Sequence, residues 1–377
     1  MQQQPPEPSA GPSDTAVPEV PFGSNAVRLT PRQWVAAVVL LLAAGSLLPK
    51  GWSRMEPLDA TPDYRIPHPL GYDYWIYQRY CRDVCRQDRT LVLGDSVVWG
   101  HYVSSDETLS HYLNKLAGED RFANLGVDGI HPVAMAGLVE SYGRPIAGRE
   151  VILHCNFLWM SSQRHDLQTS KEFNFNHPEL VPQFFPRIPC YRESFFGRLG
   201  IVVGREVPFC AWTRHLQIAY FDNATLPEWT DDHPYANPVT LRLPSPNDLP
   251  SPEPDARPWT EKHLARFNPD WVELETSFQW AYFRRIVEIL QRRGNRVFVL
   301  IGPFNEPMLT AEGLRGYQAI QSEAMVWLAA HGVQHFAATT LPSESYADAS
   351  HPLASGYKLL AEEVFKNEAF RQFLSSR

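Results

Sequence analysis

The amino-acid sequence predicts an α/β fold: a doubly wound, mostly parallel sheet of five strands between two layers of helices. One N-terminal transmembrane helix precedes this fold, and a proline-rich insertion interrupts it. Three observations predict this. Short apolar runs of strand length alternate with longer stretches of helical spacing, as in βαβ units. An uncharged run of 15 residues stands alone near the N-terminus. Ten of the 33 prolines fall between positions 226 and 269.

Composition and charge limit the class of protein. Hydrophobic residues make up 44% of the 377 positions and charged residues 20%, which is typical of a globular protein and excludes wholesale disorder. Acidic residues outnumber basic ones, 42 against 34, for a net charge of -8. Nucleic-acid binders usually carry a basic excess, so we expect no nucleic-acid partner. Five cysteines are too few for a disulfide scaffold.

The first 50 residues predict a tail and a membrane anchor. Residues 1–32 hold six prolines within the first 22 positions and few apolar side chains, which favours a disordered tail. Residues 33–50 contain the uncharged run from Trp34 to Leu48. As a helix this run spans about 22 Å, short of a hydrocarbon core of about 30 Å. Basic and tryptophan side chains at both ends suit the interface.

A cleaved signal peptide is the alternative to an anchor. Signal peptides begin with a short basic region, whereas the region here is long and rich in proline. Ala43-Ala44-Gly45 is also a poor cleavage site, so the pattern favours an uncleaved, single-pass anchor. Flanking charges do not fix the orientation. We expect the domain on the extracytoplasmic side because a single large domain follows the helix.

The remaining chain is predicted to form a linker over residues 51–75 and one domain over residues 76–377. Apolar runs predict five strands, at 90–93, 122–125, 151–153, 297–301 and 333–336. Helical spacing follows them at 109–116, 275–293, 310–331 and 353–374. An insertion at about 160–270 separates the third and fourth strands. It is either a lid or substrate-binding excursion, or a surface elaboration without a role in chemistry.

Gly94-Asp95-Ser96 directly follows the first predicted strand. Open α/β sheets place their sites at the carboxyl ends of strands, and a glycine lets the chain turn sharply there. Ser96 is therefore a candidate nucleophile. The alternative is a serine that only caps the following helix.

Asp348 precedes His351 by three residues, just before the last predicted helix. A serine nucleophile needs a general base, and the base needs an acceptor that orients its ring. An aspartate at this spacing can fold back onto the imidazole. The alternative is local helix capping, with His351 at the surface.

Two further strand ends offer hydrogen-bond donors. Gly129 follows the second strand and provides a backbone N–H, and Asn156 follows the third strand and provides a side-chain amide. Such donors are what an oxyanion hole requires. Taken one at a time, both residues are also common in turns.

These four segments occur in an order that resembles the SGNH/GDSL hydrolase superfamily, over roughly residues 88–160 and 272–374. Gly94-Asp95-Ser96 is similar to its first motif, and the last motif, D-x-x-H, is followed here by Gly356-Tyr357. The third motif departs from the usual G-x-N-D. His154 replaces its glycine and Phe157 its aspartate.

The resemblance implies a flavodoxin-like three-layer fold and a role for each motif residue. Ser96 is implied as the nucleophile, His351 as the base and Asp348 as the group that orients the base. The backbone N–H groups of Ser96 and Gly129 and the side chain of Asn156 are implied as the oxyanion hole. Neither a cofactor nor a metal is implied.

Three functions follow as hypotheses. The first is a membrane-anchored esterase that removes small acyl groups from an acylated small molecule, a glycan or a lipid of the cell envelope. The second is an O-acyltransferase that modifies envelope polysaccharide on the same scaffold. Its acceptor would need a long groove, for which the insertion offers Trp212, Trp229 and Trp259. The third is a binding or assembly protein that keeps the fold without catalysis.

Several other residues carry weaker hypotheses. His131 and His154 lie near the site in sequence, and a structural role is favoured over that of a second base. Cys81 and Cys85 lack further metal ligands nearby and are interpreted as thiols. Cys190 and Cys210 are a possible disulfide if the domain is exported. Near the membrane, four arginines at helical spacing suit either anionic headgroups or a solvated face: Arg79, Arg82, Arg86 and Arg89.

Overall fold

The computed structural model describes residues 29–58, 60–236 and 255–375. Most of the expected tail, residues 1–28, lies outside these ranges, as does the proline-rich stretch from 237 to 254. The chain divides into two compact units, Met1–Leu47 and Leu48–Arg377. The second unit holds the sheet and every candidate site residue.

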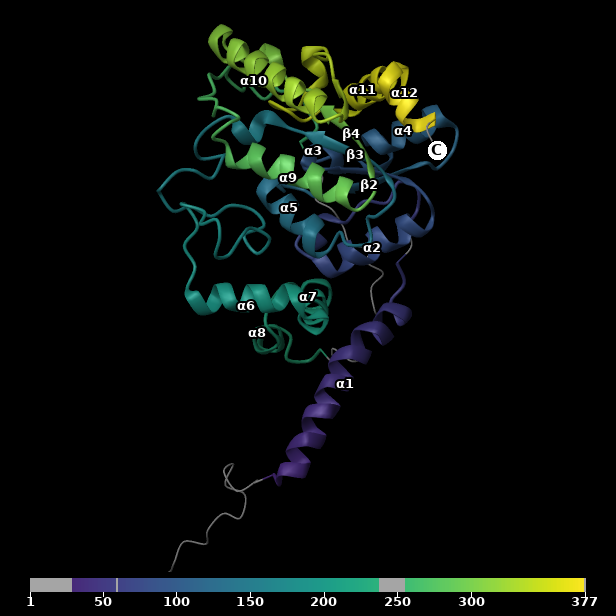
Figure 1. Cartoon of the computed structure of the whole chain (residues 1–377), viewed down its shortest axis with the longest axis vertical. Helices are drawn as coiled ribbons and strands as arrows, with labels where there is room; N and C mark the ends of the chain where they lie inside the picture. Colours follow the sequence, from purple (N-terminus) through teal and green to yellow (C-terminus); the bar gives the residue numbers. More distant parts are fainter. Residues whose placement is uncertain (1–28, 59, 237–254, 376–377) are drawn as a thin grey trace, which may run out of the picture. The chain divides into compact units, whose positions relative to one another are not determined.

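A five-stranded sheet forms the centre of the second unit, as the sequence predicted (Figure 1). All of its strand pairs are parallel, and the strand order is β2-β1-β3-β4-β5. The chain adds β2 on one side of β1 and β3 on the other, so the strand order switches at β1 and β3, which is the usual place for a site in such a sheet. The strands are β1 Thr90–Gly94, β2 Phe122–Gly126, β3 Glu150–Cys155, β4 Arg296–Ile301 and β5 Gln334–Ala337.

Alternate residues of each strand face two separate apolar cores. In β1, Leu91 and Leu93 belong to the larger core and Val92 to the smaller one, which is the period of two expected of a strand. Four helices cover the larger core: α2 Tyr74–Arg86, α5 Pro132–Ser141, α9 Phe278–Arg292 and α10 Ala311–Ala330. The other face carries α3 Ser96–Trp99, α4 Leu109–Ala117, α11 Ala354–Lys366 and α12 Glu368–Ser375.

Helix α1, Pro31–Met55, contains the expected membrane anchor. It is long and apolar enough to cross a membrane. Its 25 residues span about 37 Å at the usual helical rise, more than the apolar run alone would reach. The helix is longer than predicted because it continues through Pro49 and the polar residues after it.

The segment expected as a linker, residues 51–75, packs onto the domain. Tyr64 and Ile66 are almost fully buried, and the Ile66 carbonyl accepts a hydrogen bond from the Trp99 indole at 2.7 Å. The Arg65 guanidinium donates to the carbonyls of Trp99 and Val103. Aromatic and apolar side chains in this stretch explain the difference, since they gain from burial against the core. This segment includes the short 3₁₀-helix η1, His68–Leu70, which precedes α2.

The insertion between β3 and β4 is more helical than its composition suggested. It contains η3 Phe157–Met160, α6 Phe195–Glu206, α7 Pro208–Tyr220 and α8 Leu226–Asp232. Its three tryptophans are buried. Trp212 packs edge-on against Trp52, Trp229 stacks on His233, and the Trp259 indole donates to the Ser343 carbonyl. The long aromatic groove that acyl transfer would need is therefore not formed by these side chains.

A buried ionic cluster ties the insertion to α2 and to the end of α1. His215 of α7 lies between Asp73 and Glu56, at 2.6 Å and 2.8 Å from their carboxylate oxygens. Glu56 also pairs with Arg79. Burial acts against a charged His215, but the charges and hydrogen bonds of Asp73 and Glu56 outweigh burial and raise its pKa to about 9. The cluster therefore holds a charged histidine at neutral pH.

We expect His215→Leu to lower the free energy of unfolding by about 3–5 kcal/mol, because it leaves two buried carboxylates short of a positive partner. Since the folded-state pKa of His215 is raised, its stabilising contribution is complete below about pH 6.5. The contribution is lost as the pH rises through 9. Denaturant unfolding of the detergent-solubilised full chain across this pH range measures both effects.

The exposed histidine His331 provides the control, and His331→Leu should change stability by less than about 0.5 kcal/mol. A His215→Leu chain as stable as the unmodified one would contradict the assignment. So would a stability difference that stays constant from pH 6.5 to above 9.

Candidate active site

Ser96 lies where β1 turns sharply into α3. Asp95 caps this short helix by accepting a hydrogen bond from the Val97 N–H at 3.0 Å. Gly94 makes the turn possible, because a Cβ there would lie 2.3 Å from a Val98 methyl and 2.9 Å from the His154 Cβ. Ser96 therefore stands at the carboxyl end of β1 and at the N-terminus of a helix. Asp95, and not Ser96, is the residue that caps this helix.

His351 comes to Ser96 from the loop before α11. Its Nε2 atom lies 2.8 Å from the Ser96 Oγ. The Asp348 carboxylate accepts from the backbone N–H groups of Ser350 and His351, both at 3.0 Å, so the loop folds tightly around it. Both Asp348 oxygens lie 2.8 Å from the His351 Nδ1. The three side chains thus form a continuous chain of hydrogen bonds.

The electrostatics of this group favour an acceptor aspartate and a basic histidine. Burial raises the pKa of Asp348, but the charge of His351 and hydrogen bonds from its ring and from backbone N–H groups lower it to about 2. Burial lowers the pKa of His351, yet the Asp348 charge outweighs it and raises the pKa above the ordinary 6.5. Asp348 is therefore ionised at neutral pH and stabilises an imidazolium.

Asp95 is the centre of a second set of contacts behind the nucleophile. Its Oδ2 accepts from the side-chain amide of Asn156 and the indole of Trp159, both at 2.8 Å. Its Oδ1 lies 3.3 Å from the His154 Nδ1. Burial raises the pKa of Asp95, whereas these partners lower it to about 2. The histidine that departs from the G-x-N-D pattern thus packs on this carboxylate, and its Nε2 lies 3.0 Å from the Gly302 carbonyl.

The three candidate oxyanion donors lie at the ends of adjacent strands. Ser96 follows β1, Gly129 follows β2 and Asn156 follows β3. Among the described residues, neither the Ser96 N–H nor the Gly129 N–H has a hydrogen-bond acceptor. Gly129 adopts a φ of +69°, which favours glycine. Asn156 uses one amide hydrogen on Asp95, which leaves its second free to donate.

A second histidine–aspartate pair borders the site. The Nδ1 of His101 lies 2.8 Å from the Asp128 carboxylate, and the His101 ring centre is 5.6 Å from that of His351. Tyr102 packs edge-on against His351, and the Lys262 ammonium sits 4.1 Å above the Tyr102 ring. The mouth of the site is therefore polar and charged.

Sequence reasoning missed several supporting residues. Asn305, fully buried after β4, donates its amide to the Asp348 carbonyl at 2.9 Å and so holds the loop that carries Asp348 in place. Trp159 and His101 were also not predicted from the sequence. Asn305 and Trp159 each follow a predicted strand by a few positions, which is the signal that would have drawn attention to them.

The remaining candidates have structural roles. His131 caps α5 by accepting from the Ala134 N–H, and burial lowers its pKa to about 3, so it stays neutral. All five cysteines are free thiols, so the proposed pair of Cys190 and Cys210 is not formed. Within residues 29–58, 60–236 and 255–375, no group of three or more histidine, cysteine, aspartate or glutamate side chains is arranged to hold a metal ion.

Comparison of the chain with protein-family models and with curated proteins found no match.

Asp348→Asn should lower the pKa of His351, because it removes the negative charge that stabilises the imidazolium. NMR titration of histidine-labelled chain measures this pKa, with the signal assigned through His351→Gln. Asp63→Asn is the matched control, since Asp63 pairs with His111 at 2.8 Å elsewhere. A pKa of His351 that does not move in Asp348→Asn would contradict the arrangement.

Proposed function

We propose that this protein is a serine esterase of the SGNH/GDSL type, which cleaves small O-acyl esters through an acyl-enzyme intermediate. The observation that carries the proposal is the hydrogen-bonded series Ser96–His351–Asp348. Its two links of 2.8 Å join a nucleophile to a base and the base to an orienting carboxylate. The strand order 2-1-3-4-5 and the position of Ser96 at the end of β1 also support it.

In the first half of the reaction, His351 Nε2 takes the proton from Ser96 as Oγ attacks the ester carbonyl carbon. Asp348 stabilises the imidazolium that forms. The tetrahedral intermediate then collapses, the bond to the alcohol oxygen breaks, and His351 gives its proton to the leaving alcohol. In the second half, His351 takes a proton from water as the water oxygen attacks the acyl carbon. The bond between the acyl carbon and Ser96 Oγ then breaks, His351 returns the proton to Oγ, and the carboxylic acid leaves.

The developing oxyanion needs donors that are fixed before the reaction. The Ser96 and Gly129 N–H groups and the free amide hydrogen of Asn156 are proposed to provide them. One such donor contributes about 3–4 kcal/mol to catalysis in related serine chemistry. The Asp95 carboxylate fixes the Asn156 side chain, because it accepts the other amide hydrogen.

A small acyl group fits the surroundings of the nucleophile. Ser96 is only 8% exposed, and His154 fills space beside the strand end where the family pattern has glycine. Hydrolysis is favoured over acyl transfer because the three insertion tryptophans are buried and provide no groove for an acceptor polymer. The preserved geometry of Ser96 and His351 argues against a purely binding role.

We further propose that α1 is an uncleaved, single-pass membrane anchor that holds the domain on the extracytoplasmic side. The length and apolar character of α1 support the anchor. An acylated glycan or lipid of the cell envelope is then the substrate within reach. The orientation has a direct test: protease added outside sealed cells should digest the domain, and a protected domain would refute this location.

The hydrolysis test uses aryl acetates with the full chain in detergent. We expect turnover in the unmodified chain and none above background in Ser96→Ala. Ser161→Ala is the matched control, because Ser161 also bonds a histidine, His165, at 2.7 Å, but no described carboxylate orients that ring. Adding a polyol acceptor separates hydrolysis from transfer, since an acylated acceptor as main product would favour the transferase. Equal turnover in Ser96→Ala and the unmodified chain would refute the proposal.

Asn156→Ala should lower kcat by about 100-fold or more while changing KM little, because the lost hydrogen bond forms mainly in the transition state. Steady-state kinetics on the same esters measures both. Trp159→Phe is the control, since it removes another donor to Asp95 without touching the oxyanion. If both variants lose the same activity, Asn156 acts through Asp95 and does not belong to the oxyanion hole.

A further inference from the structure

Helix α6 of the insertion reverses the usual arrangement of a surface helix, in which apolar side chains are buried and charged side chains face the solvent. Its arginines point inward: Arg198 is 8% exposed and donates to the Tyr191 carbonyl, and Arg205 donates to the Val181 carbonyl. Its apolar residues point outward at positions i, i+4 and i+8. A helix in water normally does the reverse. The outer face of α6 is therefore suited to an apolar surrounding.

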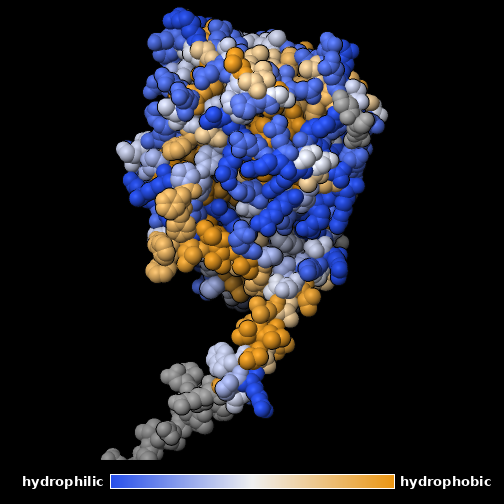
Figure 2. Space-filling model, viewed as in Figure 1, coloured by the Kyte–Doolittle hydropathy of each residue, from blue (hydrophilic) through white to orange (hydrophobic). Residues whose placement is uncertain are grey.

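The outward apolar side chains form one continuous patch with the loop before α6. The Phe184 and Phe195 rings are 5.8 Å apart, and the Phe195 and Phe196 rings 5.6 Å apart. In Figure 2 an apolar area covers the place where Figure 1 shows α6. Patches of this kind usually mark interaction sites. We call the set the α6 patch: Phe184, Phe185, Phe195, Phe196, Leu199, Val203 and Val207.

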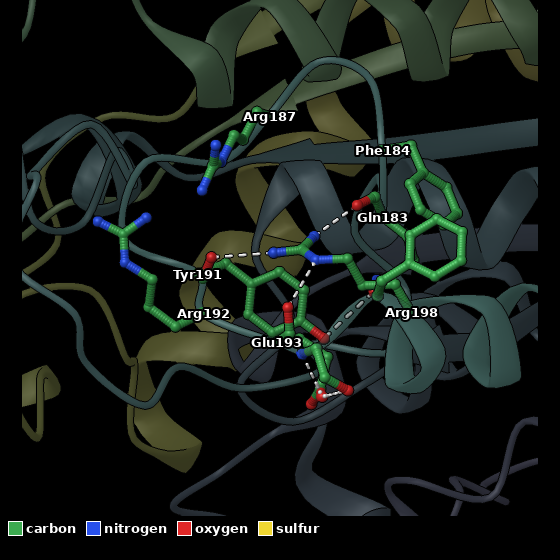
Figure 3. Close-up of a pocket in the computed structure, with 9 residues that line it drawn as sticks. Gln183, Phe184, Arg187, Tyr191, Arg192, Glu193 and Arg198 are labelled. Carbon is green, nitrogen blue, oxygen red and sulfur yellow. Dashed lines mark hydrogen bonds between the residues drawn. The ribbon is translucent and has the colours of Figure 1, made fainter.

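A basic hollow lies at the N-terminal end of the α6 patch (Figure 3). It has a volume of about 580 Å³ and is lined by Phe184 and Phe195 together with three arginines and one acidic residue, Glu193, whose carboxylate accepts from the Ser194 N–H. Arg198 is bonded to the backbone, whereas Arg187 and Arg192 reach into open space. Neither of these two guanidinium groups has a hydrogen bond or ion pair among the described residues. The hollow thus combines aromatic rings with unpaired positive charge.

A second basic hollow lies at the other end of α6, where α1 leaves the domain. Its volume is about 260 Å³, and its lining includes Lys50, Arg82, Arg144 and Arg205 against a single acidic residue, Glu206. Arg144 pairs with Glu206 at 3.1 Å. Lys50 and Arg82 have no side-chain partner in the part of the chain that the structure describes. Positive charge therefore stands at both ends of the α6 patch.

We propose that the α6 patch is a second membrane contact, which enters the lipid interface while the two basic hollows bind anionic lipid headgroups. The inference rests on the membrane anchoring proposed for α1. An amphipathic helix that lies in the interface combines an apolar face with basic residues at headgroup depth, which is the arrangement found here. Four basic side chains are proposed to bind the headgroups: Lys50, Arg82, Arg187 and Arg192.

The position of the anchor selects a lipid surface over a protein partner. Residues 48–55 at the end of α1 belong to the same compact unit as α6. They pack on α7, where Trp52 contacts Trp212 and Tyr220 edge-on. Lys50 and Arg205 of α6 line the same hollow. Lys50, which follows the apolar run of α1, is consequently next to the C-terminal end of α6.

The first experiment measures immersion of the α6 patch in liposomes that hold the full chain. A spin label is placed at Phe196→Cys in a Cys210→Ser background, since the other cysteines are buried. We expect oxygen to reach this label and a water-soluble nickel chelate to be largely excluded. Val326→Cys is the matched control, because Val326 is 66% exposed on α10 and should remain open to the chelate.

The second experiment tests the headgroup contacts. Native mass spectrometry counts phosphatidylglycerol molecules retained by the full chain, for Arg82→Gln combined with Arg187→Gln. Each basic residue near an anionic surface contributes about fivefold to binding, so retention should fall by about 25-fold. Arg371→Gln, an exposed arginine of α12, should retain lipid as the unmodified chain does.

The outcomes separate this proposal from the anchor on which it rests. A chain that is extracted from the liposomes by alkaline washing refutes the anchor and the second contact together. A chain that stays, with its Phe196 label as accessible to the chelate as the Val326 label, refutes the second contact alone. Dipolar coupling between the Phe196 labels of two copies would also overturn it, because the patch would then be an interface between chains.

Discussion

The parallel arrangement of all five strands determines where the candidate site of this protein lies. Parallel strands end at one edge of the sheet, so residues far apart in the sequence meet there. Ser96 and His351 are separated by 255 positions, yet their side chains are 2.8 Å apart. The Gly94 turn points Ser96 outward from this edge, and the tight Asp348 loop returns His351 to it. This edge of the sheet is therefore what brings the Ser96 and His351 side chains together.

The chain reinforces that edge from behind. Asp95 contacts three side chains and the N-terminus of α3 next to Ser96, the candidate nucleophile, and Asn305 holds the loop that carries Asp348. The later part of the insertion, with helices α6 and α7, does not take part in these contacts. Its helix α7 is fixed to α2 and to the end of α1 through the buried His215 cluster, and its helix α6 turns an apolar face outward. The proposed active site and the proposed membrane contact thus lie in separate parts of one compact unit.

The fold was largely readable from the sequence because buried parallel strands appear as short apolar runs of a recognisable length. All five strands and the principal helices after them lie close to their predicted positions. The positions of Ser96, Asp348 and His351 at the sheet edge were predictable because Gly94 and the Asp348–His351 spacing impose local geometry, whereas their roles remain a proposal. Residues 51–75 were expected to form a linker. Their burial could not be predicted from the sequence, because it depends on tertiary partners such as Trp99. The inward arginines of α6 were also hidden, because orientation of an insertion helix follows from packing and not from its own sequence.

His351 and Asp348 are proposed to activate Ser96 as a nucleophile, and the function proposed for this protein depends on this claim. Treatment of the full chain with a fluorophosphonate, followed by mass spectrometry of its peptides, tests this claim most directly. We expect one modified residue, Ser96, with no modification in Ser96→Ala and greatly slowed modification in His351→Ala. A folded chain that is modified at another serine, or at none, would contradict the claim.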